Sequence, residues 1–184
     1  MHLIGVTGLI GSGKNAVSDY IIDKHHYKHI DFGDIVRDFS TSIGKTHKRE
    51  DLRETRRIFT QKYDLKFFGE QVVKRIKENK WERVVITGIR YPEDIEPIKK
   101  KFGHDMILIL VEAGERVRFE RIVKRNSVRD PKTFTEFMEE ESREITLFNF
   151  SGVFAYADHR IDNSGTKEDL HKNIDKFMKE YNLD

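Results

Sequence analysis

Strand-like and helix-like patterns alternate along the whole chain. Short strand-like segments fall near residues 3–7, 27–31, 83–87, 106–111 and 159–162. Between them, apolar residues recur every three or four positions, as they do in an amphipathic helix. Alternating strands and helices predict a parallel sheet with right-handed crossovers and helices on both faces. We therefore expect a three-layer α/β/α sandwich built on a five-stranded parallel sheet.

The ends of several helices are marked by capping residues. Thr133 with Glu136, and Thr166 with Asp169, fit the capping-box pattern at which a helix begins. Asp34 is expected to cap the helix that follows the second strand. Residues 38–50 are polar and predict a loop or helix break, and 150–157 a short connector. The remaining helices are expected near residues 14–24, 50–63, 65–79, 93–101 and 115–125, then from the capping boxes to about 145 and 181.

The first strand leads directly into a glycine-rich segment, Gly8-Leu9-Ile10-Gly11-Ser12-Gly13-Lys14. This spacing matches the phosphate-binding loop G-x-x-x-x-G-K-[ST] except at its last position. Successive backbone N–H groups at a helix N-terminus bind phosphate, and glycines let the backbone approach it closely. A glycine-rich turn that binds nothing is the alternative, and the strand before and helix after the segment disfavour it. The nucleotide-binding residues predicted here are Gly8, Gly11, Ser12, Gly13, Lys14, Asn15 and Ala16.

Asn15 replaces the serine or threonine whose hydroxyl coordinates Mg²⁺ in this loop. Mg²⁺ keeps several of its waters and demands regular geometry. We therefore expect Mg²⁺ to be held mainly by water and nucleotide phosphates, and we assign no protein metal site. His25, His26 and His29 lack a carboxylate or cysteine to complete a ligand set, so a solvated turn is favoured over a metal cluster there.

Polar residues follow the second and third strands. Asp31 would lie at the carboxyl end of its strand, where open α/β sheets bind ligands, and a capping role is the alternative. Arg37 would lie one turn into the next helix. Gly88 allows a ligand to approach closely, and Arg90 offers a two-pronged donor to phosphate. A charged residue is also ordinary at a strand end, so this reading stays open.

Arginines recur in the second half of the chain. Arg121 and Arg125 are four residues apart and share one helix face. A solvated face or a nucleic-acid patch is the alternative, and the acidic run at 139–141 argues against nucleic acid.

Composition limits the class of protein. The chain has 184 residues, of which 37% are hydrophobic and 36% charged, which suits a single domain. Its 34 Lys+Arg and 32 Asp+Glu nearly balance, so net charge does not indicate nucleic-acid binding. It has no cysteine, no apolar run that would span a membrane, and no leader-like segment before the first strand. We expect a cytoplasmic protein that binds neither membrane nor nucleic acid.

The order of these motifs resembles the P-loop kinases of small molecules, in particular adenylate kinase-like nucleoside monophosphate kinases and dephospho-CoA kinase. Residues 30–37 are similar to the adenylate kinase segment whose arginine holds the acceptor phosphate, which implies that role for Arg37. Residues 87–90 resemble the segment after the third strand, which implies acceptor-phosphate binding for Arg90. Thr87 stands where the family has an acidic residue that orients Mg²⁺, and Asp31 is our candidate for a compensating carboxylate.

The resemblance extends to the C-terminal half and to poorly characterised archaeal kinase-like proteins. It implies that Arg121 covers the donor base and phosphates, that Arg125 meets the transferring group, and that residues 126–133 form a short lid. Residues 157–166 resemble the closing strand and loop of dephospho-CoA kinase, which implies donor contacts at Asn163 and Gly165. The helical segment 38–80 would bind the acceptor.

These patterns predict an ATP- and Mg²⁺-dependent phosphotransferase acting on a nucleoside or deoxynucleoside monophosphate. Lys14, Arg90 and Arg125 would be catalytic, and Asp31, Arg37, Gly88 and Arg90 would bind the acceptor, in a monomer or homodimer. Dephospho-CoA kinase and a non-catalytic ATP-binding switch are the alternatives.

Overall fold

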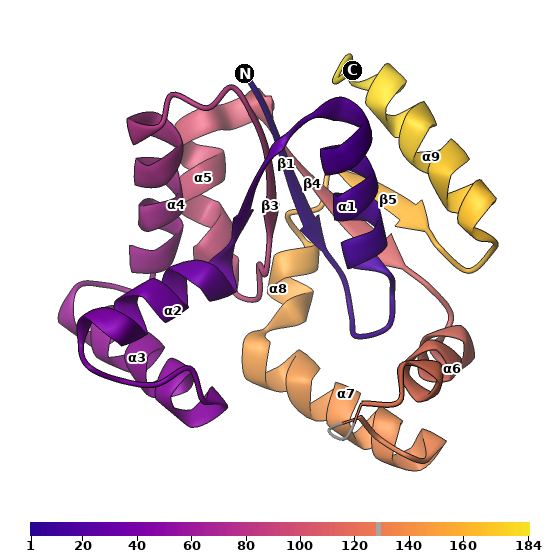
Figure 1. Cartoon of the computed structure of the whole chain (residues 1–184), viewed down its shortest axis with the longest axis horizontal. Coiled ribbons are helices and arrows are strands. Elements are labelled where there is room, and N and C mark those ends of the chain that lie inside the picture. The colour runs from indigo at the N-terminus through magenta and orange to yellow at the C-terminus, as the bar shows by residue number, and fades with distance from the viewer. Residues whose placement is uncertain (128–129) are drawn as a thin grey trace.

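The computed structural model describes residues 1–127 and 130–184 and has the expected three layers (Figure 1). Five parallel strands form one sheet in the order β2-β3-β1-β4-β5. Because β1 lies at the centre, the chain first builds one half of the sheet and then crosses to the other. The strands are β1 (His2–Thr7), β2 (Lys28–Asp31), β3 (Arg83–Thr87), β4 (Met106–Glu112) and β5 (His159–Asp162).

The helices cover both faces of this sheet and its carboxyl edge (Figure 1). In the described part of the chain they are α1 (Lys14–His25), α2 (Phe32–Ser42), α3 (Arg49–Lys62), α4 (Phe67–Glu78), α5 (Pro92–Phe102), α6 (Glu115–Arg125), α7 (Phe134–Phe148), α8 (Phe150–Phe154) and α9 (Lys167–Glu180). A short 3₁₀ turn, Gly103–Asp105, precedes β4. None of the helices in the described ranges has the length and apolar character needed to cross a membrane.

Alternation along the central strand creates two separate cores. Successive side chains of a strand point to opposite faces of the sheet. Leu3 therefore packs into a core made with α2, α3, α4, α5 and α8, whereas Ile4 and Val6 pack against α1 and α9. All three side chains are fully buried. Both faces of the sheet are thus covered by packed helices, and a cavity lies at its carboxyl edge, among the surrounding helices.

Three local expectations need correction. The helix after β2 begins at Phe32, so Asp34 lies in its first turn rather than at its cap, because Asp31 keeps an extended backbone up to the helix. That helix continues to Ser42, which shortens the predicted 38–50 loop to residues 43–48. The connector predicted at 150–157 contains helix α8, whose buried Phe150 and Val153 anchor it.

Candidate active site

The loop after β1 has the backbone needed to wrap a phosphate. Gly11 and Gly13 have φ values of +77° and +87°, which residues with a side chain rarely adopt. A Cβ on Gly11 would lie 2.6 Å from the carbonyl oxygen of Arg118, and a Cβ on Gly8 would collide with the carbonyl oxygen of Val111. Helix α1 begins directly after Gly13, so its free N–H groups face the loop. These features fit a nucleotide's phosphates.

A buried ion pair supports this loop from behind. The Arg118 guanidinium on α6 pairs with both carboxylate oxygens of Glu141 on α7, and the two side chains are only 5% and 6% exposed. Arg118 also donates to the Ile10 carbonyl at 3.3 Å and to the Ala113 carbonyl at 2.9 Å. Because one side chain contacts the loop, the end of β4 and α7, it fixes these three segments relative to one another.

Lys14 lies in a cavity of about 300 Å³ at the carboxyl edge of the sheet. Burial, with the Arg90 charge nearby, lowers the pKa of Lys14 from 10.5 to about 8, and the Glu144 carboxylate opposes that shift. Among residues 1–127 and 130–184, its ammonium makes a single hydrogen bond, a long one of 3.4 Å to the Leu9 carbonyl. A buried cation in this position is destabilised until an anion binds beside it. The site therefore favours a negatively charged ligand at Lys14.

Asp31 lies in the same cavity and is held by its neighbours. Asp31 and Thr87 are register partners of β2 and β3, and the Thr87 hydroxyl donates to the Asp31 carboxylate at 2.8 Å. The His29 ring is 2.8 Å from the same hydroxyl. Gly88 has φ +75°, and a Cβ there would lie 2.8 Å from Asp31. Gly88 thus leaves room for a carboxylate aimed into the cleft.

Arg90 lies where two cavities meet. It lines the Lys14 cavity and also a second cavity of about 460 Å³, which we call the acceptor cavity. Its guanidinium stacks 5.2 Å from the centre of the Phe148 ring and takes part in none of the ion pairs found in the described parts of the chain. Its backbone N–H donates to buried Asp94. The stack on Phe148 and the backbone hydrogen bond thus hold Arg90 in place, and its guanidinium charge remains available to a ligand.

Arginine dominates the acceptor cavity. Arg37 pairs with Asp34 and lies 3.6 Å from Asp31, so it is partly neutralised in this structure. The residues that line this cavity are Asp31, Phe32, Gly33, Val36, Arg37, His47, Arg49, Leu52, Arg53, Arg56, Gly88, Arg90, Tyr91 and Phe148. Guanidinium groups bind phosphate and carboxylate in two-pronged geometry, so these walls suit an anionic ligand.

The closing loop after β5 packs onto the phosphate loop. The buried Asn163 amide donates to the Ser12 carbonyl at 2.8 Å. Arg121 donates to the Asn163 carbonyl at 2.7 Å and makes longer contacts to the Gly11 and Ser12 carbonyls. Gly165 is two residues further on and exposed. The structure therefore brings Arg121 and Asn163, two predicted donor-binding residues, against the loop.

Arg125 is arranged differently from Arg121. It is paired with Asp130, with an N–O distance of 2.6 Å, and its side chain is 56% exposed. The segment predicted as a lid, 126–133, includes residues 128 and 129, which lie outside the described residues. Contact of Arg125 with a transferring group therefore stays a prediction.

Two cleft residues on α7 were missed from the sequence. Glu144 and Phe148 line the Lys14 cavity, and Glu144 also lies 3.4 Å from Arg49 on α3. A usable signal existed, because positions 141, 144 and 148 recur on one helix face. The acidic run at 139–141 had been used only as an argument against nucleic-acid binding. Glu144 connects Lys14 with the arginines of the acceptor cavity.

The residues present fit a Mg²⁺ ion that keeps most of its waters. Asp31 and Glu144 are the carboxylates that line the Lys14 cavity, and the Asn15 side chain lines it too. Within residues 1–127 and 130–184, no three His, Cys, Asp or Glu side chains come together as a metal site. Oxygen ligands suit Mg²⁺, which is usually bound by one or two carboxylates and substrate phosphates.

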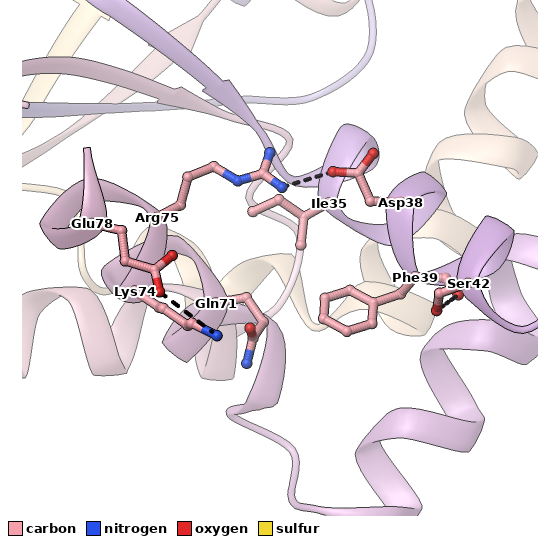
Figure 2. A pocket seen from close by; sticks show the side chains of 8 residues that line it. All are labelled: Ile35, Asp38, Phe39, Ser42, Gln71, Lys74, Arg75 and Glu78. Atoms are coloured by element: carbon pink, nitrogen blue, oxygen red, sulfur yellow. Dashed lines mark hydrogen bonds and ion pairs between the residues drawn. The ribbon is translucent and has the colours of Figure 1, made fainter.

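A further hollow lies apart from this cleft, between α2 and α4 (Figure 2). Its volume is about 250 Å³. Its charged groups pair with one another: Arg75 with Asp38 at 2.7 Å, and Lys74 with Glu78 at 3.8 Å. Because these charges already form ion pairs with one another, this hollow has less uncompensated positive charge for an anionic ligand than the acceptor cavity.

Comparison with known proteins agrees with this geometry. A family model described as an AAA domain matches residues 7–137, which include the phosphate loop and the cleft segments up to the start of α7. A UPF0200 protein of Methanothermobacter thermautotrophicus is 32% identical over 179 residues, covering 97% of this chain and 90% of that protein. A UPF0200 protein of Thermococcus gammatolerans is 29% identical and covers 94% and 91%.

Solved structures share the fold. Shikimate kinase from Bacteroides thetaiotaomicron superimposes with a TM-score of 0.63 at 14% identity, covering 99% of both chains. Shikimate kinase from Acinetobacter baumannii, solved with shikimate, gives 0.62 at 12% identity, covering 100% of this chain and 96% of that one. At such identities the likeness concerns the fold, which is that of the P-loop small-molecule kinases. The chain belongs to the AAA domain family by its match over residues 7–137, and to the UPF0200 proteins by its identity to the relative from Methanothermobacter thermautotrophicus.

Proposed function

We propose that this protein transfers the γ-phosphoryl group of ATP to a nucleoside or deoxynucleoside monophosphate. One observation carries the proposal: Arg90 lines both the Lys14 cavity and the arginine-rich acceptor cavity. Two phosphate-bearing substrates bound in these cavities would meet at Arg90. Phosphoryl transfer depends chiefly on positioning the two substrates in this way and on stabilising the negative charge of the transferring group.

The roles of the side chains follow from their positions. Lys14 would contact the β- and γ-phosphates, and Arg90 would stabilise charge on the group in transit. Arg37 would exchange its carboxylate partners for the acceptor phosphate, and Gly88 would let that phosphate approach the end of β3. Arg121 and Asn163 would shape the donor side, with Gly165 beside them. Arg125 would reach the transferring group only after leaving Asp130.

When bound with ATP, Mg²⁺ would supply neutralisation of the phosphate charge. Asp31 and Asn15 would hold the ion through its waters, and Thr87 would keep the Asp31 carboxylate in place. Bound in this way, Mg²⁺ would depend on the nucleotide for most of its affinity.

A product assay tests this proposal directly. The protein is incubated with ATP, Mg²⁺ and each common ribo- and deoxynucleoside monophosphate, and the products are identified by mass spectrometry. We expect one or a few acceptors to be phosphorylated at about 1 per second or faster. The Lys14→Met variant provides the background. Bound ATP with no acceptor phosphorylated would contradict the proposal and favour a nucleotide-binding switch.

A hydroxyl acceptor, such as the ribose of dephospho-CoA, is a second candidate because of Asp31. A kinase that phosphorylates a hydroxyl needs a base to accept its proton, whereas a phosphate acceptor needs none. Asp31 lies in both cavities and is oriented by Thr87.

The Asp31→Asn variant separates the two candidates. With a hydroxyl acceptor, kcat should fall about 10²- to 10⁴-fold, since the variant loses its base. With a phosphate acceptor, the loss should be small and should shrink further at high Mg²⁺. A variant with unchanged kcat under both conditions would remove Asp31 from the mechanism.

A further inference from the structure

Helix α3 has its two kinds of charge on different sides. Two of its acidic residues contact the preceding loop: Asp51 accepts a hydrogen bond from Thr46, and Glu54 pairs with Lys45 at 2.6 Å. Its arginines line cavities instead. These are Arg49, Arg53, Arg56 and Arg57. Because the loop satisfies the acids, the cleft side of α3 is left basic.

An outer cavity of about 310 Å³ adjoins the acceptor cavity. Arg53, Arg56 and Tyr91 line both, so a ligand that spans these residues would contact both cavities. The other residues that line the outer cavity are Arg57, Thr60, Leu65 and Glu93. No residue of the outer cavity lines the Lys14 cavity. The outer cavity is therefore separated from the transfer point by the acceptor cavity.

The arginines of the outer cavity differ in how far they are neutralised. Arg56 is paired with the fully buried Asp94 and stacks 4.2 Å from the centre of the Tyr91 ring, so its role is largely structural. Arg57 lies 3.8 Å from Glu54, with both side chains exposed. Arg53 takes part in none of the ion pairs found in the described parts of the chain. Arg53 and Arg57 are therefore the cations available to a ligand here.

The basic side of α3 is longer than the reacting group requires. Arg49 and Arg57 are eight residues apart, which corresponds to about 12 Å along a helix. In the proposed reaction, Arg37 and Arg90 already bind the phosphate of the acceptor that reacts. Cations at the far end of α3 would remain without an anion if the acceptor had only one charged group.

We propose that the acceptor carries a second anionic group, and that Arg53 and Arg57 bind it in the outer cavity. The inference rests on the proposed phosphotransferase function and revises its acceptor: beyond the group that reacts at Arg90, the acceptor nucleotide carries a diphosphate or a second phosphate. Leu65 and Tyr91 provide an apolar surface beside that group. Arg53 is then the residue that sets specificity between singly and doubly phosphorylated acceptors.

Binding is measured by calorimetry with the donor site filled by a non-hydrolysable ATP analogue and Mg²⁺. The probes are AMP, adenosine 3′,5′-bisphosphate and ADP-ribose, which separate a remote phosphate from a diphosphate. We expect one of the two larger probes to bind about tenfold or more tightly than AMP, as a charge-assisted contact provides. Arg53→Ala should abolish that difference. Arg53 is exposed and makes no ion pair with the described residues, so this variant should fold normally.

Lys62→Ala is the matched control, because it removes one positive charge from the same helix at an exposed residue outside both cavities. It should keep the preference. Equal binding of all three probes, absence of binding by the larger two, or a preference that survives Arg53→Ala would each overturn the proposal.

Phosphoryl transfer is then measured separately with ATP. Tight binding of a probe with two phosphate groups, when neither it nor any nucleoside monophosphate is phosphorylated, would contradict the proposed function and support the second subsite. Transfer to AMP with the same kcat/KM in Arg53→Ala and wild type, and no preference for the larger probes, would contradict the subsite and leave the function standing.

Discussion

The donor and acceptor sides of the cleft are built in different ways. On the donor side, Arg118, Glu141 and Asn163 are buried and bond to the phosphate loop or to each other. On the acceptor side, Arg49 and Arg53 are exposed side chains of α3 that line the acceptor cavity. The first side is built from buried side chains, whereas the second includes exposed side chains at the surface of α3.

This difference matches the demands of the two ligands. In the proposed reaction the donor is always ATP, so a preformed donor site loses little by being rigid. Acceptors vary, and exposed side chains on a helix can change without disturbing the sheet. We therefore expect donor-side substitutions to affect stability and catalysis together, and acceptor-side substitutions to affect specificity alone.

The Glu141→Gln variant should have the largest effect. It leaves the Arg118 charge buried without its counter-ion, which typically costs about 3–5 kcal/mol of the free energy of unfolding. Chemical denaturation measures this loss. Arg143→Ala, an exposed residue on the same helix, is the control and should change stability by less than about 0.5 kcal/mol.

The double variant Arg118→Met/Glu141→Leu tests the cause of that loss. Replacing both charges with apolar groups of similar size is often close to neutral for stability. The double variant should therefore be more stable than Glu141→Gln. It should still bind ATP more weakly than wild type, since the Ile10 carbonyl has lost its donor. Equal stability of the single and double variants would mean that packing, not charge, accounts for the loss.

Lys14→Met should lower turnover about 10²- to 10³-fold, the usual cost of removing one preorganised donor to transition-state charge. Lys14→Met should not lower the free energy of unfolding, because burial already disfavours the lysine charge in the ligand-free protein. Turnover and thermal unfolding are measured on the same preparation. A variant that loses stability instead would show that the lysine has a structural role.

The lowered pKa of Lys14 also predicts pH dependence. With a pKa of about 8, Lys14 loses its proton in the ligand-free protein between pH 7 and 9, whereas bound phosphates keep it protonated. Affinity for ATP should fall about tenfold over that range. Lys14→Arg, which stays charged, should show a flat profile. A wild-type profile that is equally flat would place the pKa above 9.

The same shift affects stability with the opposite sign. The folded-state pKa lies below the ordinary 10.5, so the unfolded chain binds more protons between about pH 8 and 10.5. The contribution of Lys14 to the stability of the free protein therefore rises with pH across that window.

The sequence was sufficient for the sheet and for the donor loop. All five strands were predicted within a residue or two, because apolar segments bounded by glycine and polar residues have few alternatives. The capping boxes at Thr133 and Thr166 are confirmed. Gly11 and Gly13 could be interpreted individually, since a positive φ leaves few choices of residue.

The cleft walls contributed by α7 could not be predicted in the same way. Glu144 and Phe148 are brought to Lys14 by the Arg118–Glu141 pair, a contact between residues 23 positions apart. No local pattern encodes that pairing. Likewise, neither the buried Asp94 partner of Arg56 nor the absence of a described partner at Arg53 can be inferred from a run of charges. Local signals predicted the strands and the glycine-rich loop, whereas tertiary contacts decide which other side chains line the cleft.

The smallest predicted effect tests whether α7 joins the two sides. Thr133→Ala and Thr166→Ala each remove a capping hydroxyl, from α7 and α9, and each should cost about 1 kcal/mol of stability. Helix α9 packs on the face of the sheet away from α3, whereas α7 carries Glu144 into the cleft. Only Thr133→Ala should therefore also raise KM for the acceptor. Equal kinetics in the two variants would mean that α7 is held by its tertiary contacts, and that its cap contributes to stability without affecting how the cleft binds its acceptor.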